Sequence, residues 1–583
     1  MLVNITINGK ALQVPAGYTI LKAASENGIY IPRLCFLEGI HEESSCRVCV
    51  VEIQGQRTLK NACTFQVFEN MVVKTNTPKV KDAVKQNLEL VAANHVFECW
   101  KCVREHNCEL LDLLRKYNVE NKYGENPVYS KKERHILTSD ALTIDSGKCT
   151  LCGRCVSACE KLAGTSVLGF NKRGSQTIVG PALLHSIEDS GCIYCGKCIQ
   201  ACPVGALRET TQVEKVEQLL DAEEKFLVIQ AAPAVRAALG EEFGLPIGTN
   251  VEGKMYQAFK QLGFNEIVDV NWAADLTIME EGTELLERIE NNGTLPLFTS
   301  CSPGWIRYIE QYQPSYLENL SSCKSPNQMC GAMVKHYLAP KLNVKPEDVV
   351  VVSVMPCIAK KSEAKRSEME FDGIRDVDYV LTTRELAALI KRRGIDFVNL
   401  EDYKPTSPLA EFTGAGNIFG ATGGVMEAAI RTVAEILEGK ELDSIDYEVV
   451  RGNKEIKEAT VILGGKEINV AVVHGGKAIK EFFEILEKGE KQYHFVEFMG
   501  CVGGCINGGG QPIVKCDVLE KVDVKALRAK ALYDQDANMP LRKSHKNESV
   551  MKAYEEFLGK PGSHKAHDLL HTHYSAKDFY SEE

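Results

Sequence analysis

Two cysteine runs with identical spacing carry the strongest chemical signal in the sequence. Each reads C-x2-C-x2-C-x3-C, and the second follows the first by about 43 residues. In proteins with two such cubanes, three closely spaced thiolates bind one cluster and the fourth cysteine binds its neighbour. Zinc is the alternative for any CxxC pair, but eight thiols in this doubled pattern make it remote. The spacing predicts two [4Fe–4S] sets: Cys149, Cys152, Cys155 and Cys202, then Cys192, Cys195, Cys198 and Cys159.

A further set of four cysteines lies near the N-terminus. Ten residues separate its first two members, which departs from the C-x4-C-x2-C spacing of plant-type ferredoxins. The strands and helix expected around it are typical of a β-grasp domain and favour a [2Fe–2S] centre, with structural zinc as the alternative. The set is Cys35, Cys46, Cys49 and Cys63.

The segment HVFECWKCVREHNC supplies three cysteines and a histidine four residues before the first of them. Because a zinc site uses the same Cys3His ligands, residue types alone leave zinc and a [4Fe–4S] cluster open. His106 is a rival imidazole, less favoured because it lies inside the loop between two ligands. The predicted ligands are His95, Cys99, Cys102 and Cys108.

Cysteine is the outlier in an otherwise ordinary globular composition, with 22 among 583 residues. Disulfide scaffolds are usually short secreted domains, and the N-terminal segment lacks the basic-then-apolar layout of a signal peptide. We therefore expect metal-bound thiols in a cytoplasmic protein. No apolar run long enough to span a membrane is present. The formal charge of −11 argues against nucleic-acid binding, but a local patch remains able to dock an acidic electron carrier.

The cysteine blocks suggest a multidomain α+β and α/β chain. We expect a β-grasp [2Fe–2S] domain at 1–78, a small helical His/Cys cluster domain at 79–125, a two-[4Fe–4S] ferredoxin-like domain at 126–209 and a large α/β catalytic domain at 210–583. In the last region, apolar strands alternate with amphipathic helices. Three strands run directly into cysteine segments, at 299–301, 355–357 and 499–501. Because strand ends carry the chemistry of α/β folds, one centre gathered from three distant stretches is predicted.

Four remaining segments resemble the signature segments of iron-only hydrogenases, and the resemblance is closest to the monomeric clostridial type. They are FTSCSPGW (298–305), VMPCIAKKSE (354–363), FMGCVGGCINGGGQP (498–512) and TIMEEGTE (277–284). The N-terminal part alone also resembles the large iron–sulfur subunit of respiratory complex I, but the catalytic segments do not.

The resemblance implies an H-cluster, which is a cubane joined through one cysteine to a two-iron site with CO, cyanide and azadithiolate. It also implies three accessory [4Fe–4S] clusters and one [2Fe–2S] cluster. Three cubane ligands match Cys357, Cys501 and Cys505, with Cys505 as the bridge to the two-iron site. Lys360 matches the lysine that holds a cyanide. The other matching pocket residues are Pro233, Met355 and Met499.

The first catalytic segment departs from the family pattern, which reads Thr-Ser-Cys-Cys-Pro. There the second cysteine ligates the cubane and the first relays protons, whereas this chain has Cys301 followed by Ser302. Three outcomes are open: Ser302 ligates as an alkoxide, Cys301 shifts to ligate and the relay changes, or the fourth coordination position is weakened. Because a neutral hydroxyl is a poor ligand for iron normally held by thiolates, softness alone favours Cys301 as the ligand.

A proton route to the buried metal is also implied by the resemblance. Glu281 and Glu284 lie three apart, on one side of an expected helix. With Ser321 and Cys301 they match the relay of the family, and Arg288 matches its outer end. The alternative is that the two glutamates only solubilise a helix face.

The predicted function is the reversible reduction of protons to H2, with electrons from reduced ferredoxin or flavodoxin and a two-iron site inserted by a maturation machinery. One alternative is the hydrogen-activating subunit of an electron-bifurcating or NAD(P)-linked complex, although no dinucleotide fingerprint stands out in this chain. Another is a hydrogen sensor, which Ser302 keeps open. Cys323, Cys330 and Cys516 are left without a role.

Overall fold

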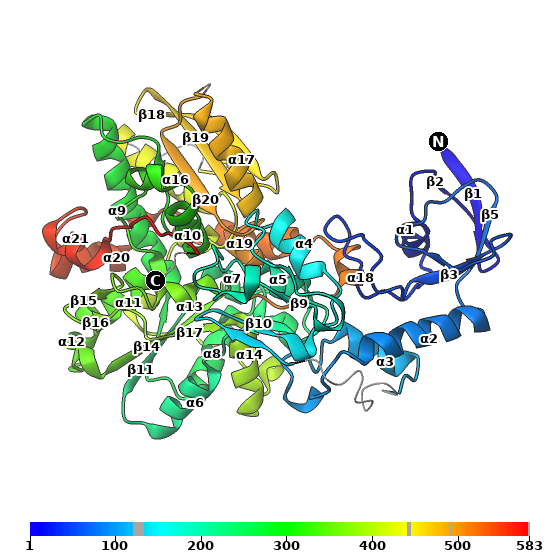
Figure 1. The fold of residues 1–583 in the computed structure, drawn as a ribbon. Coiled ribbons are helices and arrows are strands. Elements are labelled where there is room, and N and C mark those ends of the chain that lie inside the picture. Colours follow the sequence, from blue (N-terminus) through cyan, green and yellow to red (C-terminus); the bar gives the residue numbers. More distant parts are fainter. Residues whose placement is uncertain (121–132, 440–444, 490, 581–583) are drawn as a thin grey trace.

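The computed structural model describes residues 1–120, 133–439, 445–489 and 491–580. It confirms a multidomain chain that mixes helices and strands. Figure 1 shows the N-terminal domain at one end of an elongated molecule and the catalytic region at the other. The predicted boundary at residue 125 lies outside the described residues. Within the described ranges, no helix is long and apolar enough to cross a bilayer.

The N-terminal domain is a five-stranded sheet packed on one helix. The strand order is β2-β1-β5-β3-β4, with β1 and β5 parallel. The turn between β1 and β2 uses Asn8 and Gly9, both with positive φ (51° and 85°), as a two-residue hairpin requires. The elements are β1 (Leu2–Ile7), β2 (Lys10–Pro15), α1 (Ile20–Glu26), β3 (Val50–Ile53), β4 (Lys60–Asn61) and β5 (Met71–Lys74).

Helices and short strands build the two regions that follow. The helix α2 (Pro78–Ala92) leads to the His/Cys segment, which ends at α3 (Glu109–Lys116). The ferredoxin-like region has a three-stranded sheet of order β10-β7-β6 and a separate hairpin. Its elements are β6 (Ile136–Thr138), β7 (Leu142–Asp145), α4 (Arg154–Lys161), β8 (Gly169–Asn171), β9 (Ile178–Gly180), α5 (Lys197–Ala201) and β10 (Leu207–Glu209).

The catalytic region contains two four-stranded sheets. The first is fully parallel, in the order β12-β11-β14-β17. Its central strands are apolar except for Gln230 and Ser353, as expected where helices cover both faces of a parallel sheet. The strands are β11 (Phe226–Ala231), β12 (Glu266–Asp269), β14 (Val349–Met355) and β17 (Tyr379–Thr382). The helices of this half are α6 (Val213–Ala222), α7 (Pro233–Arg236), α8 (Glu252–Leu262), α9 (Val270–Glu290), α11 (Pro326–Met333), α12 (Ala339–Lys341), α13 (Ala359–Glu363) and α14 (Thr383–Arg392).

The second sheet has the order β13-β20-β19-β18, with only the β18–β19 pair antiparallel. Its strands are β13 (Leu297–Phe298), β18 (Ile456–Leu463), β19 (Lys466–His474) and β20 (Phe495–Met499). A short hairpin, β15 (Glu370–Phe371) and β16 (Ile374–Arg375), lies apart. The remaining helices are α10 (Pro303–Tyr312), α15 (Gly414–Ile418), α16 (Gly424–Glu438), α17 (Gly476–Glu487), α18 (Cys516–Leu519), α19 (Val524–Asn538), α20 (Glu548–Ala553) and α21 (His564–Leu570).

The three strands predicted to run into cysteine segments are present as β13, β14 and β20. In the first sheet, β12 ends at Asp269, and Val270 begins α9. Asp269 caps this helix by accepting from the backbone N–H of Asn271, at 2.8 Å, and pairs with the fully buried Arg236 at 2.6 Å. Because a buried guanidinium needs such a partner, this ion pair joins the end of β12 to α7 and fixes the start of α9.

Candidate active site and electron-transfer clusters

The eight cysteines of the doubled run form two separate pockets, grouped as the exchanged-ligand pattern requires. One pocket, of about 370 Å³, is lined by Cys159, Cys192, Cys195 and Cys198. The other, of about 270 Å³, is lined by Cys149, Cys152, Cys155 and Cys202. Each set therefore brings four sulfur ligands around a space of its own.

A third pocket, of about 290 Å³, is lined by His95 together with Cys99, Cys102 and Cys108. The Nδ1–H of His95 donates to the carbonyl oxygen of Lys148 at 2.9 Å, which leaves Nε2 unprotonated and able to bind metal. The rival His106 has an 89% exposed side chain and does not line this pocket.

The N-terminal set is also assembled. The Sγ atoms of Cys49 and Cys63 lie 3.3 Å apart, and the backbone N–H of Cys46 donates to Cys35 Sγ at 3.4 Å. Such close sulfur contacts suit four thiolates that share one small cluster. Hydrogen bonding from Cys46 lowers the pKa of Cys35 to about 5.

The accessory sets contact one another through backbone and small side chains. Ser45 Oγ, beside the N-terminal set, donates to the carbonyl oxygen of Cys152 at 3.0 Å. Gly205 lies against Cys102, because a Cβ at Gly205 would come within 2.5 Å of the Cys102 sulfur. The N-terminal and His95 sets thus both adjoin the ferredoxin-like region.

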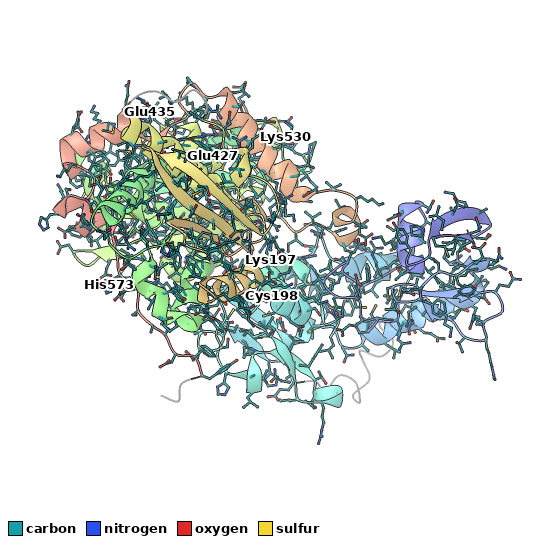
Figure 2. All side chains as sticks on the ribbon, turned by 90° about the horizontal axis from the view of Figure 1, so that it is seen from above. Lys197, Cys198, Glu427, Glu435, Lys530 and His573 are labelled. Atoms are coloured by element: carbon teal, nitrogen blue, oxygen red, sulfur yellow. The ribbon has the colours of Figure 1, made fainter. Side chains whose placement is uncertain are left out.

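The ferredoxin-like region meets the catalytic region at two glycines. A Cβ at Gly196 would lie 2.7 Å from the Cα of Gly509. Cys501 Sγ lies 3.9 Å from the carbonyl oxygen of Cys195. The buried Lys197 donates from Nζ to Gln200 at 2.7 Å and also bonds the carbonyl of Asn507. Figure 2 shows Lys197 and Cys198 at this junction, near the middle of the molecule.

A cavity of about 720 Å³ in the catalytic region lies between the two sheets. It collects residues that follow β11, β13, β14 and β20, so strand ends from both sheets open onto one space. All predicted pocket residues line it: Pro233, Cys301, Ser302, Met355, Cys357, Lys360, Met499, Cys501 and Cys505.

These residues fit a cubane and a bulky attached group. Burial raises the pKa of the Cys357 and Cys505 thiols, so thiolates at these positions need a bound metal to supply positive charge. Glycine is required nearby: a Cβ at Gly508 would lie 2.2 Å from the carbonyl oxygen of Pro356. Lys360 Nζ donates to the carbonyl oxygen of Cys301 at 3.1 Å and to Glu363 at 2.8 Å, which holds its ammonium at the cavity wall.

Cys301 and Ser302 have different surroundings within the cavity. Burial raises the pKa of the Cys301 thiol, and the Glu281 carboxylate raises it further. Ser302 Oγ accepts a hydrogen bond of 3.1 Å from the backbone N–H of Gly500, directly before Cys501.

The residues predicted for the relay lie close together. The Arg288 guanidinium donates to Glu284 at 2.6 Å, and Ser321 Oγ donates to the same carboxylate at 2.9 Å. Ser321 also lies near Glu281, whose pKa is raised to about 8, first by burial and then by the Glu284 carboxylate. Glu281 is only 3% exposed, so it does not solubilise a helix face.

Some neighbours of the site were not singled out from the sequence. Glu497 is fully buried in β20 and accepts the backbone N–H groups of Gly423 and Met426, at 2.7 and 2.8 Å. A glutamate inside an otherwise apolar strand was the available signal. Ser322 and His571 join the relay at Glu284, but 249 residues separate them, so no local pattern links them.

Two of the cysteines without a predicted role are structural. Cys330 is buried in the main core of the first sheet. Cys516 lies 3.5 Å from Glu109 and 3.8 Å from Arg154, where the C-terminal part of the chain meets the cluster regions.

Comparison with known families gives a match over every cluster region. Residues 225–509 match the iron-only hydrogenase large subunit, C-terminal domain, and residues 522–577 match the iron hydrogenase small subunit. Residues 1–78 match a 2Fe-2S cluster binding domain, 85–122 the iron–sulfur binding region of NADH-ubiquinone oxidoreductase G, and 148–206 a 4Fe-4S dicluster domain.

Individual relatives extend this match to the whole chain. Iron hydrogenase 1 of Clostridium pasteurianum is 46% identical, over 98% of this chain and 99% of its own. NADP-reducing hydrogenase subunit HndD of Solidesulfovibrio fructosivorans is 44% identical, also over 98% of this chain and 99% of its own. A variant of the HydA1 hydrogenase of Chlamydomonas reinhardtii has a TM-score of 0.56 and 39% identity, covering 62% of this chain and 99% of its own.

The chain belongs to the iron-only hydrogenases. It is an oxidoreductase that produces or oxidises H2 at an H-cluster and carries accessory [2Fe–2S] and [4Fe–4S] clusters, as the sequence predicted.

The geometry of the relay predicts a pH dependence and a sensitive residue. A carboxyl group with a pKa of about 8 is protonated and able to donate below that pH, so H2 evolution should fall as pH rises through about 8. Glu281→Gln cannot pass a proton and should lower H2 evolution by about 10²–10⁴-fold.

The measurement is H2 evolution against pH with saturating reductant. Glu290→Gln is the matched control because Glu290 is exposed on the same helix. Undiminished turnover in Glu281→Gln would contradict a relay through Glu281.

Proposed function

We propose that this hydrogenase accepts electrons from reduced ferredoxin or flavodoxin at the surface over the His95 set. The observation that carries this proposal is an apolar patch on the cluster loop: Trp100 and Val103 are 74% and 63% exposed. Exposed aromatic residues of this kind are typical of protein-binding surfaces. Both residues flank cluster cysteines, so a carrier bound there lies close to a redox centre.

The charge of the patch supports an acidic carrier. The Lys101 side chain, between Trp100 and Cys102 in the sequence, is 60% exposed, and two cations, Lys101 and Arg134, pair with the one carboxylate of Glu98. By contrast, Glu42 and Glu43 lie exposed between Cys35 and Cys46 of the N-terminal set. Because complementary charge steers association, the His95 surface is the better docking site for an acidic ferredoxin or flavodoxin.

Electrons would then pass inward through the ferredoxin-like clusters. The contact at Gly205 joins the His95 set to this region, and the contact between Gly196 and Gly509 joins it to the active site. Small residues at both contacts keep neighbouring centres close. The N-terminal set offers a second input branch through Ser45 and Cys152.

Trp100→Ala should raise the KM for reduced ferredoxin about tenfold or more, since truncating a central aromatic contact typically costs 2 kcal/mol or more of binding energy. H2 evolution driven by a small reduced dye should stay unchanged, because a dye does not need the docking surface. Steady-state kinetics with both donors makes the comparison.

Ile462→Ala is the control for this test. Ile462 is 58% exposed and lies on β18, the edge strand of the second sheet. An unchanged KM for both ferredoxin and flavodoxin in Trp100→Ala would contradict docking at this patch.

Protons would reach the active site along the residues of α9 and the loop after β13. When bound, the H-cluster supplies redox-active iron and a bridging amine at which protons and electrons combine. Arg288 holds Glu284 at the outer end, Ser321 links the two carboxylates, and Glu281 faces Cys301. Lys360 would present an ammonium to a cyanide, and Pro233, Met355 and Met499 line the cavity that would hold the two-iron site.

We assign the last step of the proton relay to Cys301 and the fourth ligand position of the cubane to Ser302. The thiolate ligands of the cubane are Cys357, Cys501 and Cys505. The thiol of Cys301 interacts with Glu281, which suits the last step of a relay. Ser302 Oγ is held beside Cys501 by the N–H of Gly500. Position therefore favours Ser302 at the cubane, although softness alone favours Cys301.

Cys301→Ala should lower H2 evolution by about 10²–10⁴-fold, because it removes the final proton donor. Ser302→Cys keeps that donor and adds a thiolate at the cubane, so it should retain turnover. Turnover of Cys301→Ala equal to that of the unsubstituted enzyme would contradict this assignment.

Membership of an NADP-linked complex is the second candidate, favoured by the 44% identity to the NADP-reducing hydrogenase subunit HndD. A flavoprotein subunit would then use the Trp100 surface in place of a free carrier. Co-purification of such a subunit from the native cell, lost with Trp100→Ala, would support this candidate. A sensor is less favoured because Arg288, Glu284 and Ser321 are joined by hydrogen bonds and Glu281 is buried beside them, as a relay requires.

The proposal includes a cytoplasmic location and insertion of the two-iron site by a dedicated maturation machinery. All 22 cysteines are free of disulfides, as expected for a reducing compartment.

A further inference from the structure

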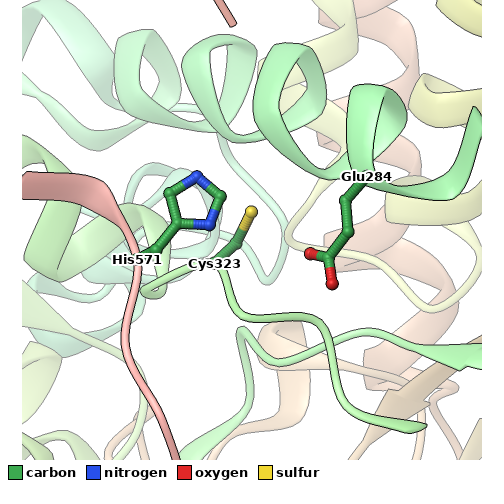
Figure 3. A group of neighbouring side chains, drawn as sticks. All are labelled: Glu284, Cys323 and His571. Carbon is green, nitrogen blue, oxygen red and sulfur yellow. The ribbon is translucent and has the colours of Figure 1, made fainter. Parts of the chain in front are cut away.

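A group of metal-binding side chains adjoins the proton relay and shares Glu284 with it. Glu284 on α9, Cys323 in the loop after β13 and α10, and His571 after α21 each offer one ligand atom, and these atoms lie within 4.8 Å of one another. Figure 3 shows the three side chains converging from separate segments. Cys323 is fully buried, and the side chain of His571 is 6% exposed.

The histidine is held as a metal-binding histidine usually is. His571 Nε2 bonds to Glu280 Oε2 at 3.0 Å, and that carboxylate also accepts from Tyr554 and from the N–H of Gly562. A carboxylate on one ring nitrogen orients the ring and leaves the other nitrogen free to coordinate. Here the other nitrogen is Nδ1, which lies against Ser322 Oγ.

Ser322 marks the place between the prospective ligands. Its Oγ lies 2.8 Å from His571 Nδ1 and 3.2 Å from Glu284 Oε2. The single hydroxyl hydrogen can be donated to only one of these two acceptors at a time, whereas a cation would bind both. The ligand atoms would need to close by about 1 Å to reach tetrahedral zinc distances.

We propose that Glu284, Cys323 and His571 form an inhibitory site for a thiophilic divalent cation of the Zn²⁺ class. One thiolate, one imidazole and one carboxylate are ligands that zinc accepts, and a water completes four-coordination. The bound cation occupies the Glu284 carboxylate, which then no longer accepts a proton from the outer end of the relay. This inference rests on the proposed relay for its effect on turnover, but the site itself does not.

The test uses matured holoenzyme, so that the cluster cysteines are filled. The enzyme is incubated anaerobically with ZnCl2 and freed of excess metal, then its zinc content is measured and its zinc K-edge X-ray absorption recorded. One equivalent of tightly bound zinc is expected, with one sulfur ligand at about 2.3 Å. In parallel, Zn²⁺ should lower H2 evolution at least tenfold, relative to the metal-free rate of the same sample.

Three variants separate the site from general effects of zinc. Cys323→Ala and His571→Gln each remove one ligand and should raise the Zn²⁺ concentration for half-inhibition at least tenfold; the second also serves if the first does not fold. Cys330→Ala is the matched control, because Cys330 is an equally buried free cysteine that lies outside the proposed site, on α11. It should bind zinc and respond to it like the unsubstituted enzyme.

Two results would overturn parts of this account separately. Equal zinc content and sulfur ligation in Cys323→Ala and the unsubstituted enzyme would refute the site. Zinc bound through Cys323 without loss of turnover would leave the site standing and refute the relay through Glu284.

Discussion

The contact between Gly196 and Gly509 is the constraint on which the architecture depends. Electrons must pass from a surface cluster to a buried active site, and each added layer of side chains would lengthen the gap between centres. A Cβ at Gly196 would lie 2.7 Å from Gly509 Cα, so backbone meets backbone where the ferredoxin-like region joins the catalytic region. The cysteine loops on both sides, which hold Cys195 and Cys501, are thereby brought together.

The two sheets of the catalytic region explain how ligands distant in sequence share one cavity. Strands β14 and β20 belong to different sheets, yet both end at the space between them and are followed by Cys357 and Cys501. Strand cores are apolar and rigid, while the loops beyond them are free to carry cysteine and glycine. The buried pair of Arg236 and Asp269 anchors α9 to the first sheet and so positions the relay glutamates beside the same cavity.

Local sequence was sufficient for features that repeat or alternate. The doubled cysteine spacing predicted the grouping of Cys159 with the second run, because the chemistry of two cubanes depends on that spacing. The strands before each catalytic cysteine were also predicted, since short apolar runs bounded by cysteine and glycine leave few alternatives to a buried strand. The boundary between β12 and α9 has no such local signal, because Val270 is compatible with either a strand or a helix.

Features that depend on tertiary contacts were out of reach. Neither Ser322 nor His571 has a local signal, and only the packing of α21 against the loop near Cys323 unites them. The choice between Cys301 and Ser302 was similarly undecidable from residue type. Softness favours the Cys301 sulfur as the iron ligand. In the structure, however, the Cys301 thiol is close enough to Glu281 for the carboxylate to raise its pKa, and the Ser302 hydroxyl lies beside Cys501.

The central claim is that the active-site cluster is held without Cys301, which serves the proton route instead. Infrared spectroscopy of matured Cys301→Ala tests this most directly, because CO and cyanide ligands report an intact two-iron site whether or not protons arrive. The account predicts CO and cyanide bands of the same intensity as in the unsubstituted enzyme. Loss of these bands in a folded protein that retains its accessory clusters would contradict it and identify Cys301 as a cubane ligand.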